Sequence, residues 1–402
     1  MIINFYLSHK IHKDKTKSWL KAAIILNLGV LAYFKYSNFL LDSFVSLVKV
    51  LGGEYSEIKI SYWLPLGISF YTFQIIAYLV DVSNEKVALE KSFINFGVFK
   101  CFYGQLIAGP IVRAQDFIPQ LKIKRIFEMK NIQIGVYYIL AGLFLKICLA
   151  DTLAQYVDFG FLQSGKNGFV GSWCTIYAFA VQILTDFWGY STIAIGVAYM
   201  YGINLPINFN CPYSAKSLRE FWRKWHITLS FWLRDYLYIP LGGNRRKHAR
   251  NLLITMTLGG LWHGASWNFV IWGLGHGLWL VLERSFRGTV ASGRLISVIN
   301  RIIVFHGVCL LWVFFRAPNL TQAYEFIKDL LFLANANTTA NFDSLFVLLV
   351  TYVLFEIFLG NSIRSKVFYN WTLKKQVAIS LLLILAIIAN ASAKLDFIYF
   401  VF

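Results

Sequence analysis

The chain has 402 residues, of which 57% are hydrophobic and 18% aromatic, while only 14% are charged. Soluble domains carry roughly 25% charged residues, so the 38 basic and 20 acidic side chains are too few to cover the surface of a water-soluble protein of this length. The mean hydropathy of +0.57 agrees. The composition excludes a soluble globule and a disordered chain, and it predicts a polytopic membrane protein.

The formal net charge of +18 lies mostly in short segments between apolar runs, such as residues 10–21, 122–130, 245–250 and 364–375. Short basic loops are typical of membrane proteins, where they stay on the cytoplasmic side. The aromatic residues lie inside apolar runs and do not alternate with the basic ones, so we expect the lipid bilayer as a partner and no nucleic acid. The five cysteines show no spacing typical of a metal site, and we expect no metal.

Apolar runs long enough to cross hydrocarbon as helices recur along the chain. Two of them, 170–202 and 251–283, exceed the length of one upright helix. Each is therefore predicted to form two shorter helices or one tilted, broken helix, and the break in 170–202 is expected near Gly189. The sequence predicts an all-α membrane protein with ten or eleven transmembrane or re-entrant helices in a single domain, 1–402. The remaining spans are expected at 18–34, 36–52, 63–82, 92–112, 133–150, 296–316, 343–360 and 376–393.

The segment 217–234 has a different pattern. Its apolar residues recur at helical spacing, and its basic residues fall on the opposite face. We therefore predict one amphipathic helix that lies along an interface or dips partway into the protein. The apolar face contains Trp222, Trp225, His226, Leu229 and Leu233, and the polar face contains Arg219, Arg223 and Lys224. Residues 238–244 then predict a turn.

Two histidines are the candidates for chemistry. His263 lies in an uncharged run, where ionisable side chains usually mark a functional path. Its small neighbours Gly259, Gly260, Gly264 and Ala265 allow close approach either of a substrate or of another helix, and both interpretations stay open. His226 lies on the apolar face of the amphipathic helix and could be catalytic or simply a hydrogen-bonded interfacial residue.

Among the acidic residues, Asp186 is the only carboxylate deep inside its apolar run. It could orient a histidine, pair with an arginine or mark a helix break. The adjacent Arg234 and Asp235 could serve only to fix the loop after the amphipathic helix. The sequence has no GxSxG, HExxH, P-loop or GxGxxG motif, so serine hydrolase, metalloprotease, ATPase and dinucleotide chemistry are unsupported. General base catalysis by histidine remains, as needed for acyl transfer to a hydroxyl.

Several segments resemble the membrane-bound O-acyltransferase (MBOAT) superfamily, and in particular its bacterial alginate O-acetyltransferase branch. The resemblance runs from about residue 33 to residue 400. It is carried by FWRKWHITLS at 221–230, WLRDYLYIPLGGNR at 232–245 and GGLWHGA at 259–265. LPLGISFY at 64–71, LIAGPIVR at 106–113, NFNCPY at 208–213 and FIYF at 397–400 extend it.

The resemblance implies a helical enzyme with a central tunnel in the bacterial cytoplasmic (inner) membrane. It implies transfer of acetyl from a cytoplasmic donor to a hydroxyl of an extracytoplasmic glycan, such as alginate or peptidoglycan, or to a periplasmic partner acetyltransferase. No bound cofactor is expected, and acetyl-CoA or another acyl thioester is the expected donor. His263 is expected to be the general base, while His226 positions the donor or stabilises developing charge. Residues expected to bind substrate are Asp186, Arg234, Asp235, Trp262 and Trp225.

The chain also departs from this family. Members usually carry about two further helices before the region of residues 33–36, so either the start is truncated or this branch is shorter. Trp188 and Thr192 stand where the family usually has serine and aspartate. Two other functions stay open: D-alanyl transfer toward teichoic acid, and a transporter whose buried histidines relay protons. Inverted repeats would favour a transporter, but the sequence contains no second copy of either histidine motif.

Overall fold

The computed structural model describes residues 1–14, 16–54, 59–61, 65–106, 109–285, 293–332, 342–360, 363 and 367–391. The regular structure within these ranges is helical, which confirms the predicted all-α class. The helices form two compact units, Met1–Lys124 with Leu261–Ser266, and Arg125–Gly260 with Trp267–Phe402. The single domain expected over 1–402 stays a prediction. Leu64, Ile107, Ala108 and the motif at 397–400 lie outside the described residues.

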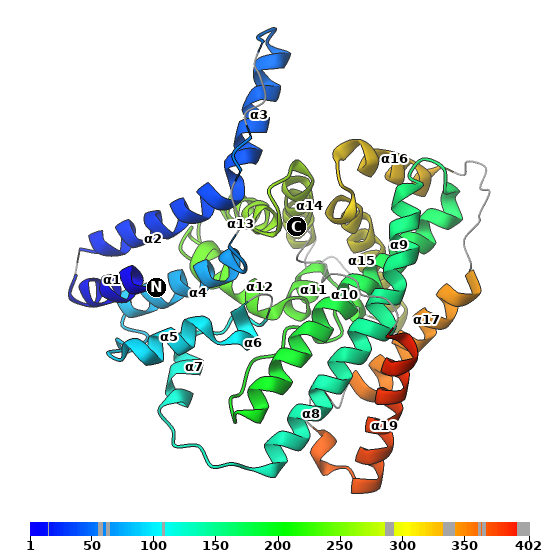
Figure 1. Cartoon of the computed structure of the whole chain (residues 1–402). Coiled ribbons are helices and arrows are strands. Elements are labelled where there is room, and N and C mark those ends of the chain that lie inside the picture. Colours follow the sequence, from blue (N-terminus) through cyan, green and yellow to red (C-terminus); the bar gives the residue numbers. More distant parts are fainter. Residues whose placement is uncertain are drawn as a thin grey trace. The chain divides into compact units, whose positions relative to one another are not determined.

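In the first unit, the spans predicted at 18–34 and 36–52 form one uninterrupted helical run. It consists of α2 (Ser18–Leu31), the π-helical turn η1 (Ala32–Tyr36) and α3 (Ser37–Val50). Figure 1 shows α2 and α3 pointing in different directions, so the π-helical turn bends the run. Only 6% of the most apolar window of this run is buried, which leaves its side chains free to face hydrocarbon.

The other two spans predicted in the first unit, 63–82 and 92–112, form shorter helices than expected. The single span expected at 92–112 is wrong, because the helix stops at Phe102, whose backbone is extended (φ −60°, ψ 115°). The chain instead forms two short helices there. Apart from the bent run, this unit contains α1 (Ile2–Lys13), α4 (Ile68–Ser83), α5 (Phe93–Cys101), α6 (Tyr103–Leu106) and α7 (Ala114–Leu121).

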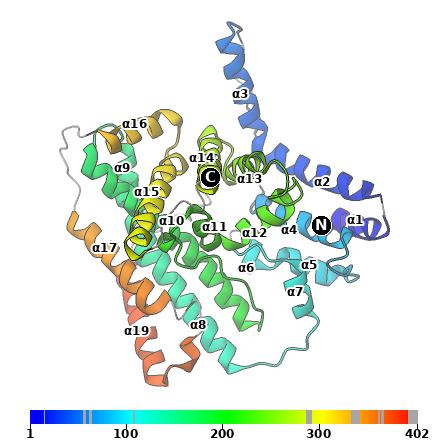
Figure 2. The ribbon, with the colours of Figure 1, turned by 180° about the vertical axis from the view of Figure 1, so that it is seen from behind.

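The second unit is built around α10 (Gly168–Met200), one unbroken helix of 33 residues. The break expected near Gly189 is therefore wrong. Its most apolar window is 72% buried. It packs on a second long run made of α8 (Met129–Leu143), the π-helical η2 (Phe144–Asp151) and α9 (Thr152–Leu162), and Figures 1 and 2 both show α8 beside α10.

Glycines explain how closely these two runs approach each other. A Cβ atom added at Gly142 would lie 2.6 Å from the carbonyl oxygen of Gly189, and one at Gly196 would lie 2.6 Å from that of Gly135. Gly189 is therefore a contact point between helices and not a helix break. Small residues at helix crossings are a common basis of packing in membranes.

A buried ion triad joins the same two runs. The Lys146 ammonium in η2 lies 2.7 Å from an oxygen of Asp151 and 2.8 Å from one of Asp186 on α10. Both carboxylates are nearly inaccessible to solvent. Of the three interpretations of Asp186 from sequence, a basic partner is thus the one found, although the partner is a lysine and not an arginine. Pairing within the protein offsets the high cost of charge in an apolar interior.

The remaining segments of the second unit complete the helical fold. Of the two alternatives predicted for 251–283, two shorter helices is the one found, because the chain leaves helical geometry between His263 and Trp267. The elements are η3 (Pro212–Ser214), α11 (Leu218–Lys224), α12 (Ile227–Leu233), η4 (Arg234–Tyr238), α13 (His248–His263), α14 (Trp267–Ser285), α15 (Arg294–Arg316), α16 (Leu320–Leu331), α17 (Phe342–Phe355), η5 (Glu356–Gly360), η6 (Val367–Asn370) and α19 (Leu373–Asn390). The end of α13, from Leu261 on, belongs to the first unit.

Among the described residues, five helical runs are long and apolar enough to cross a membrane. Two shorter apolar helices, Ile68–Ser83 and Leu345–Phe355, accompany them. This number is smaller than the ten or eleven predicted. Two predicted spans merge into one run, those at 92–112 and 251–283 are each divided into helices outside the five, and those at 63–82 and 343–360 correspond to the two shorter helices. The five runs are Ser18–Val50, Met129–Leu162, Gly168–Met200, Arg294–Arg316 and Leu373–Asn390.

The glycine contact between α8 and α10 gives a prediction about stability. Gly142→Ala should destabilise the protein by about 1–3 kcal/mol, because the added methyl group overlaps backbone that cannot move aside. Thermal unfolding in detergent, followed by circular dichroism, measures the change. Gly29→Ala is the control, since a Cβ there meets no heavy atom within 4 Å. Equal unfolding temperatures for the two variants would contradict the packing described.

Candidate functional site

His263 is the last residue of α13, and a lysine from the bent run holds this helix end. The Lys35 ammonium donates hydrogen bonds to the carbonyl oxygens of Trp262 (2.5 Å) and His263 (3.1 Å) and to Ser69 Oγ (3.2 Å). The Tyr36 hydroxyl donates to the Leu261 carbonyl (2.7 Å). The last carbonyls of a helix lack partners within the helix. Here the π-helical turn supplies them, and this fixes the backbone that carries His263.

Trp262 fixes the same segment through its ring. The indole packs against Phe70 and Phe73, with ring centroids 5.0 and 5.4 Å away, and its Nε1 donates to the Ser69 carbonyl (3.4 Å). The His263 ring lies edge-on to this indole, and the His263 side chain is only 5% exposed. The surroundings thus place the imidazole in a water-poor environment. The role of Trp262 in substrate binding remains a prediction.

The small residues before His263 serve helix packing in part. A Cβ at Gly260 would overlap the carbonyl oxygen of Phe269 on α14, and one at Gly273 would overlap that of Met256. Gly260 therefore allows α13 and α14 to approach closely. The packing interpretation holds for this glycine, and it leaves the role of His263 itself open.

His226 lies at a break in the amphipathic segment. The single helix predicted over 217–234 is wrong: α11 ends at Lys224 and α12 begins at Ile227. His226 itself has left-handed backbone geometry (φ 40°), which no helix interior accommodates. The predicted faces are nevertheless confirmed, since Trp222 and Leu229 are buried while Arg219 and Arg223 are exposed.

The break is stabilised by the loop that precedes the amphipathic segment. The Ile227 amide donates to the Asn208 carbonyl (3.0 Å), and the Asn210 amide donates to the Lys224 carbonyl (3.0 Å). The Asn208 side chain accepts from Thr228 Oγ1 (2.7 Å) and donates to Ser191 Oγ on α10 (3.1 Å). These bonds satisfy backbone groups that one continuous helix would have paired internally.

The imidazole of His226 is fully buried against the edge of Phe187, with ring centroids 4.6 Å apart. Burial lowers the pKa of His226 to about 3. Its ring is therefore neutral at physiological pH, with one nitrogen able to donate and the other able to accept.

Trp225 lies in an aromatic cluster next to His226. Its indole is 1% exposed and packs between Phe221 (5.6 Å between centroids), Phe209 (5.1 Å) and Trp312 (4.9 Å). This environment accounts for Trp225 as a core residue. Its expected contact with substrate stays a prediction.

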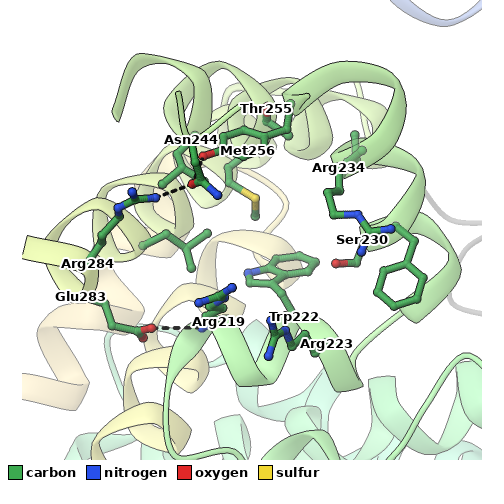
Figure 3. A pocket seen from close by; sticks show the side chains of 15 residues that line it. Arg219, Trp222, Arg223, Ser230, Arg234, Asn244, Thr255, Met256, Glu283 and Arg284 are labelled. Atoms are coloured by element: carbon green, nitrogen blue, oxygen red, sulfur yellow. Dashed lines mark hydrogen bonds between the residues drawn. The ribbon is translucent and has the colours of Figure 1, made fainter. Parts of the chain in front are cut away.

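The three polar residues expected to bind substrate are all engaged within the second unit. Arg234 donates from Nε (2.6 Å) and a terminal nitrogen (3.1 Å) to the two carboxylate oxygens of Asp235, which supports the interpretation that they fix the loop. Asp186 belongs to the triad with Lys146. Arg234 also lines a cavity (Figure 3). Binding of substrate by these residues stays a prediction.

Two lysines were missed from sequence, and each had a detectable signal. Lys35 and Lys146 both lie at or within apolar runs, where a lysine is costly unless it is paired. The ionisable candidates predicted inside apolar runs are histidines and an aspartate, and these two cations are not among them. The partners of Lys35, and the partner Asp186 of Lys146, lie far away in the chain and could not be deduced from spacing, whereas Asp151 lies only five residues after Lys146.

A model of the family described as MBOAT, membrane-bound O-acyltransferase, matches residues 82–321. The chain is 36% identical over 365 residues to a peptidoglycan O-acetyltransferase of Helicobacter pylori, covering 82% of this chain and 68% of that protein. It is 42% identical over 311 residues to a probable alginate O-acetylase AlgI of Pseudomonas aeruginosa, covering 76% and 59%. A teichoic acid D-alanyltransferase of Bacillus subtilis is 26% identical over 262 residues, covering 61% and 66%.

The chain thus spans between 59% and 68% of the length of these three relatives. The match confirms the predicted enzyme class, a multi-pass membrane O-acyltransferase of the type whose relatives are named for O-acetylation of cell-envelope polysaccharides. The chain belongs to the membrane-bound O-acyltransferase family.

Proposed function

We propose that this protein transfers acetyl from a cytoplasmic acyl thioester to a hydroxyl of an extracytoplasmic glycan, directly or through a periplasmic partner acetyltransferase. The observation that carries the proposal is the similarity, at 36% and 42% identity, to proteins named for O-acetylation of peptidoglycan and alginate. The bacterial relatives favour the inner membrane. Acetyl-CoA is the proposed acyl thioester. The proposed acceptor is a polysaccharide of the kind for which the relatives are named.

His263 has the role of general base in this proposal. An alcohol is a poor nucleophile until its proton is removed, and a buried imidazole can accept that proton. The hydroxyl oxygen then attacks the thioester carbonyl, so that a C–O bond forms and the C–S bond breaks. The proton held by the imidazole passes to the departing thiolate, which leaves as a free thiol. The hydrogen bonds from Lys35 to the carbonyls of Trp262 and His263 support this role, because they fix the base at one position.

His226 has a positioning role toward the donor. A neutral imidazole can donate a hydrogen bond to a carbonyl oxygen and stabilise the negative charge that develops there. Its lowered pKa supports this role and argues against a permanent positive charge. Transfer of D-alanyl toward teichoic acid is the second candidate, and the lower identity of 26% to a teichoic acid D-alanyltransferase places it behind acetyl transfer.

The role of His263 predicts the loss of transfer without the loss of folding. His263→Ala should reduce acetyl transfer about 100-fold or more, the contribution typical of a general base. The measurement follows labelled acetyl from acetyl-CoA to far-side glycan or partner protein in sealed vesicles, at equal amounts of folded protein. His12→Ala, an exposed histidine of α1, is the control. Equal transfer by the two variants would exclude His263 as the base.

For His226, two substitutions separate chemistry from backbone geometry. Asparagine tolerates the left-handed conformation of residue 226 better than alanine does. His226→Asn should therefore unfold at nearly the wild-type temperature yet show kcat/KM for the donor reduced about 10-fold or more. His226→Ala should lose stability as well. If His226→Asn retains full activity while His226→Ala does not, the backbone geometry is the whole contribution of this residue.

A further inference from the structure

The short segment 208–210, between α10 and η3, bonds to both helix ends at the break that contains His226. The Asn210 amide donates to the carbonyl of Lys224, the last residue of α11 (3.0 Å). That carbonyl is one of those that lack a partner inside their own helix. Asn208 makes the corresponding contacts at the start of α12. One segment therefore satisfies the end of one helix and the beginning of the next.

Asn208 caps α12 in place of the residue that normally would. The side chain of an N-cap residue usually accepts a hydrogen bond from one of the first amides of its own helix. His226 has the N-cap position, but within α12, which the structure describes in full, its imidazole makes no capping bond. The Asn208 carbonyl instead accepts from the Ile227 amide (3.0 Å). The Asn208 side-chain oxygen accepts from the Thr228 amide (3.4 Å) and hydroxyl (2.7 Å).

Helix α10 holds both the ring and the backbone of residue 226. The Phe187 ring packs edge-on against the His226 imidazole, with centroids 4.6 Å apart. Ser191 lies four residues further along, on the same face of α10. Its hydroxyl oxygen accepts from the Asn208 side-chain nitrogen (3.1 Å). Asn208 and Ser191 are each 1% exposed, so this bond is shielded from solvent. The imidazole is thus placed on α10 directly through Phe187 and indirectly through Asn208.

The backbone of His226 depends on such outside support. Its φ of 40° is unfavourable for a residue with a side chain, and surrounding contacts must enforce it. An N-cap residue that caps its own helix typically has extended backbone geometry. Because Asn208 provides the cap, residue 226 can adopt the left-handed conformation, and its ring lies against Phe187 instead of over the amides of α12.

We propose that Asn208 is a positioning residue for His226. It takes over the capping of α12, so that the imidazole serves the reaction instead, and through Ser191 it fixes the imidazole relative to α10. This inference rests on the proposed role of His226 toward the acyl donor. The competing explanation is that Asn208 only stabilises the fold, and the experiment is designed to separate the two.

The test uses the full chain in lipid membranes, at equal amounts of folded protein. Asn208→Ala removes the side-chain bonds to Thr228 and Ser191 and keeps the backbone carbonyl. The control is Asn4→Ala. Asn4 is also a buried asparagine, and it exchanges two side-chain hydrogen bonds with Asn27 in the first unit (3.0 and 2.8 Å). The control therefore breaks a comparable polar pair without changing the segment 208–210.

Thr228→Val is a milder second variant. Valine keeps the shape of the side chain but lacks the hydroxyl that donates to Asn208. It provides the same test if Asn208→Ala does not fold, with a smaller expected effect.

The first measurement requires no acyl transfer. Nuclear magnetic resonance of the protein with isotope-labelled histidine records the ring nitrogens, and His226→Asn identifies the signal of His226. Asn208→Ala and Thr228→Val should shift this signal, while Asn4→Ala should leave it in place. A His226 signal that is unmoved in Asn208→Ala or in Thr228→Val would overturn the proposal.

The second measurement is kcat/KM for acetyl-CoA in sealed vesicles. Asn208→Ala should lower it about tenfold, the size of effect typical of a misplaced group, and Asn4→Ala should not. When His226 is already asparagine, Asn208→Ala should cause no further loss, because a positioning residue acts only through the imidazole. Equal fractional losses with and without His226 would show a purely structural role and overturn the proposal. If the wild type transfers no acetyl, the proposed function fails, and the resonance measurement still decides whether Asn208 positions His226.

Discussion

A half-buried ammonium at the end of a helix is the interaction on which the position of His263 depends. The final carbonyls of α13 have no partners inside their own helix, and an apolar interior offers no water to replace them. Lys35 and Tyr36 provide three hydrogen bonds to these carbonyls from a π-helical turn more than two hundred residues earlier in the chain. The bend in the α2–α3 run and the end of α13 therefore stabilise each other, and together they fix the position of the His263 imidazole.

His226 illustrates the same physical constraint in the second unit. Its left-handed backbone interrupts a helix, and the freed backbone groups are paired with residues 208 and 210. Both candidate histidines thus lie at helix ends, where side chains and loops take over the backbone hydrogen bonds. The Lys146 triad extends this principle to charge, because both buried carboxylates contact the one ammonium between them. Glycine contacts between α8 and α10 then allow the approach that brings Lys146 to Asp186.

Composition and periodicity were sufficient to predict the helical membrane fold, the two faces of the amphipathic segment and the division between α13 and α14. They failed where tertiary contacts decide. Gly189 resembles a helix breaker in sequence, yet it is a packing point inside an unbroken helix. His226 fits helical spacing, yet hydrogen bonds with the preceding loop hold it outside the helix. Lys35 and Lys146 were not predicted, because the contacts of Lys35 with the end of α13 and of Lys146 with Asp186 join different helices, and no local pattern encodes such pairs.

The motifs around the two histidines predicted the family, and the match of the family model over residues 82–321 confirms it. The measurement that tests this account most directly compares acetyl transfer by Lys35→Met and Lys35→Arg with that of the wild type, at equal folded amounts in sealed vesicles. We expect Lys35→Met to lose about tenfold or more in kcat with little change in the KM for the donor, because the carbonyls at the end of α13 lose their donor and His263 shifts. Lys35→Arg should recover part of the rate. A wild-type rate in Lys35→Met would contradict the account.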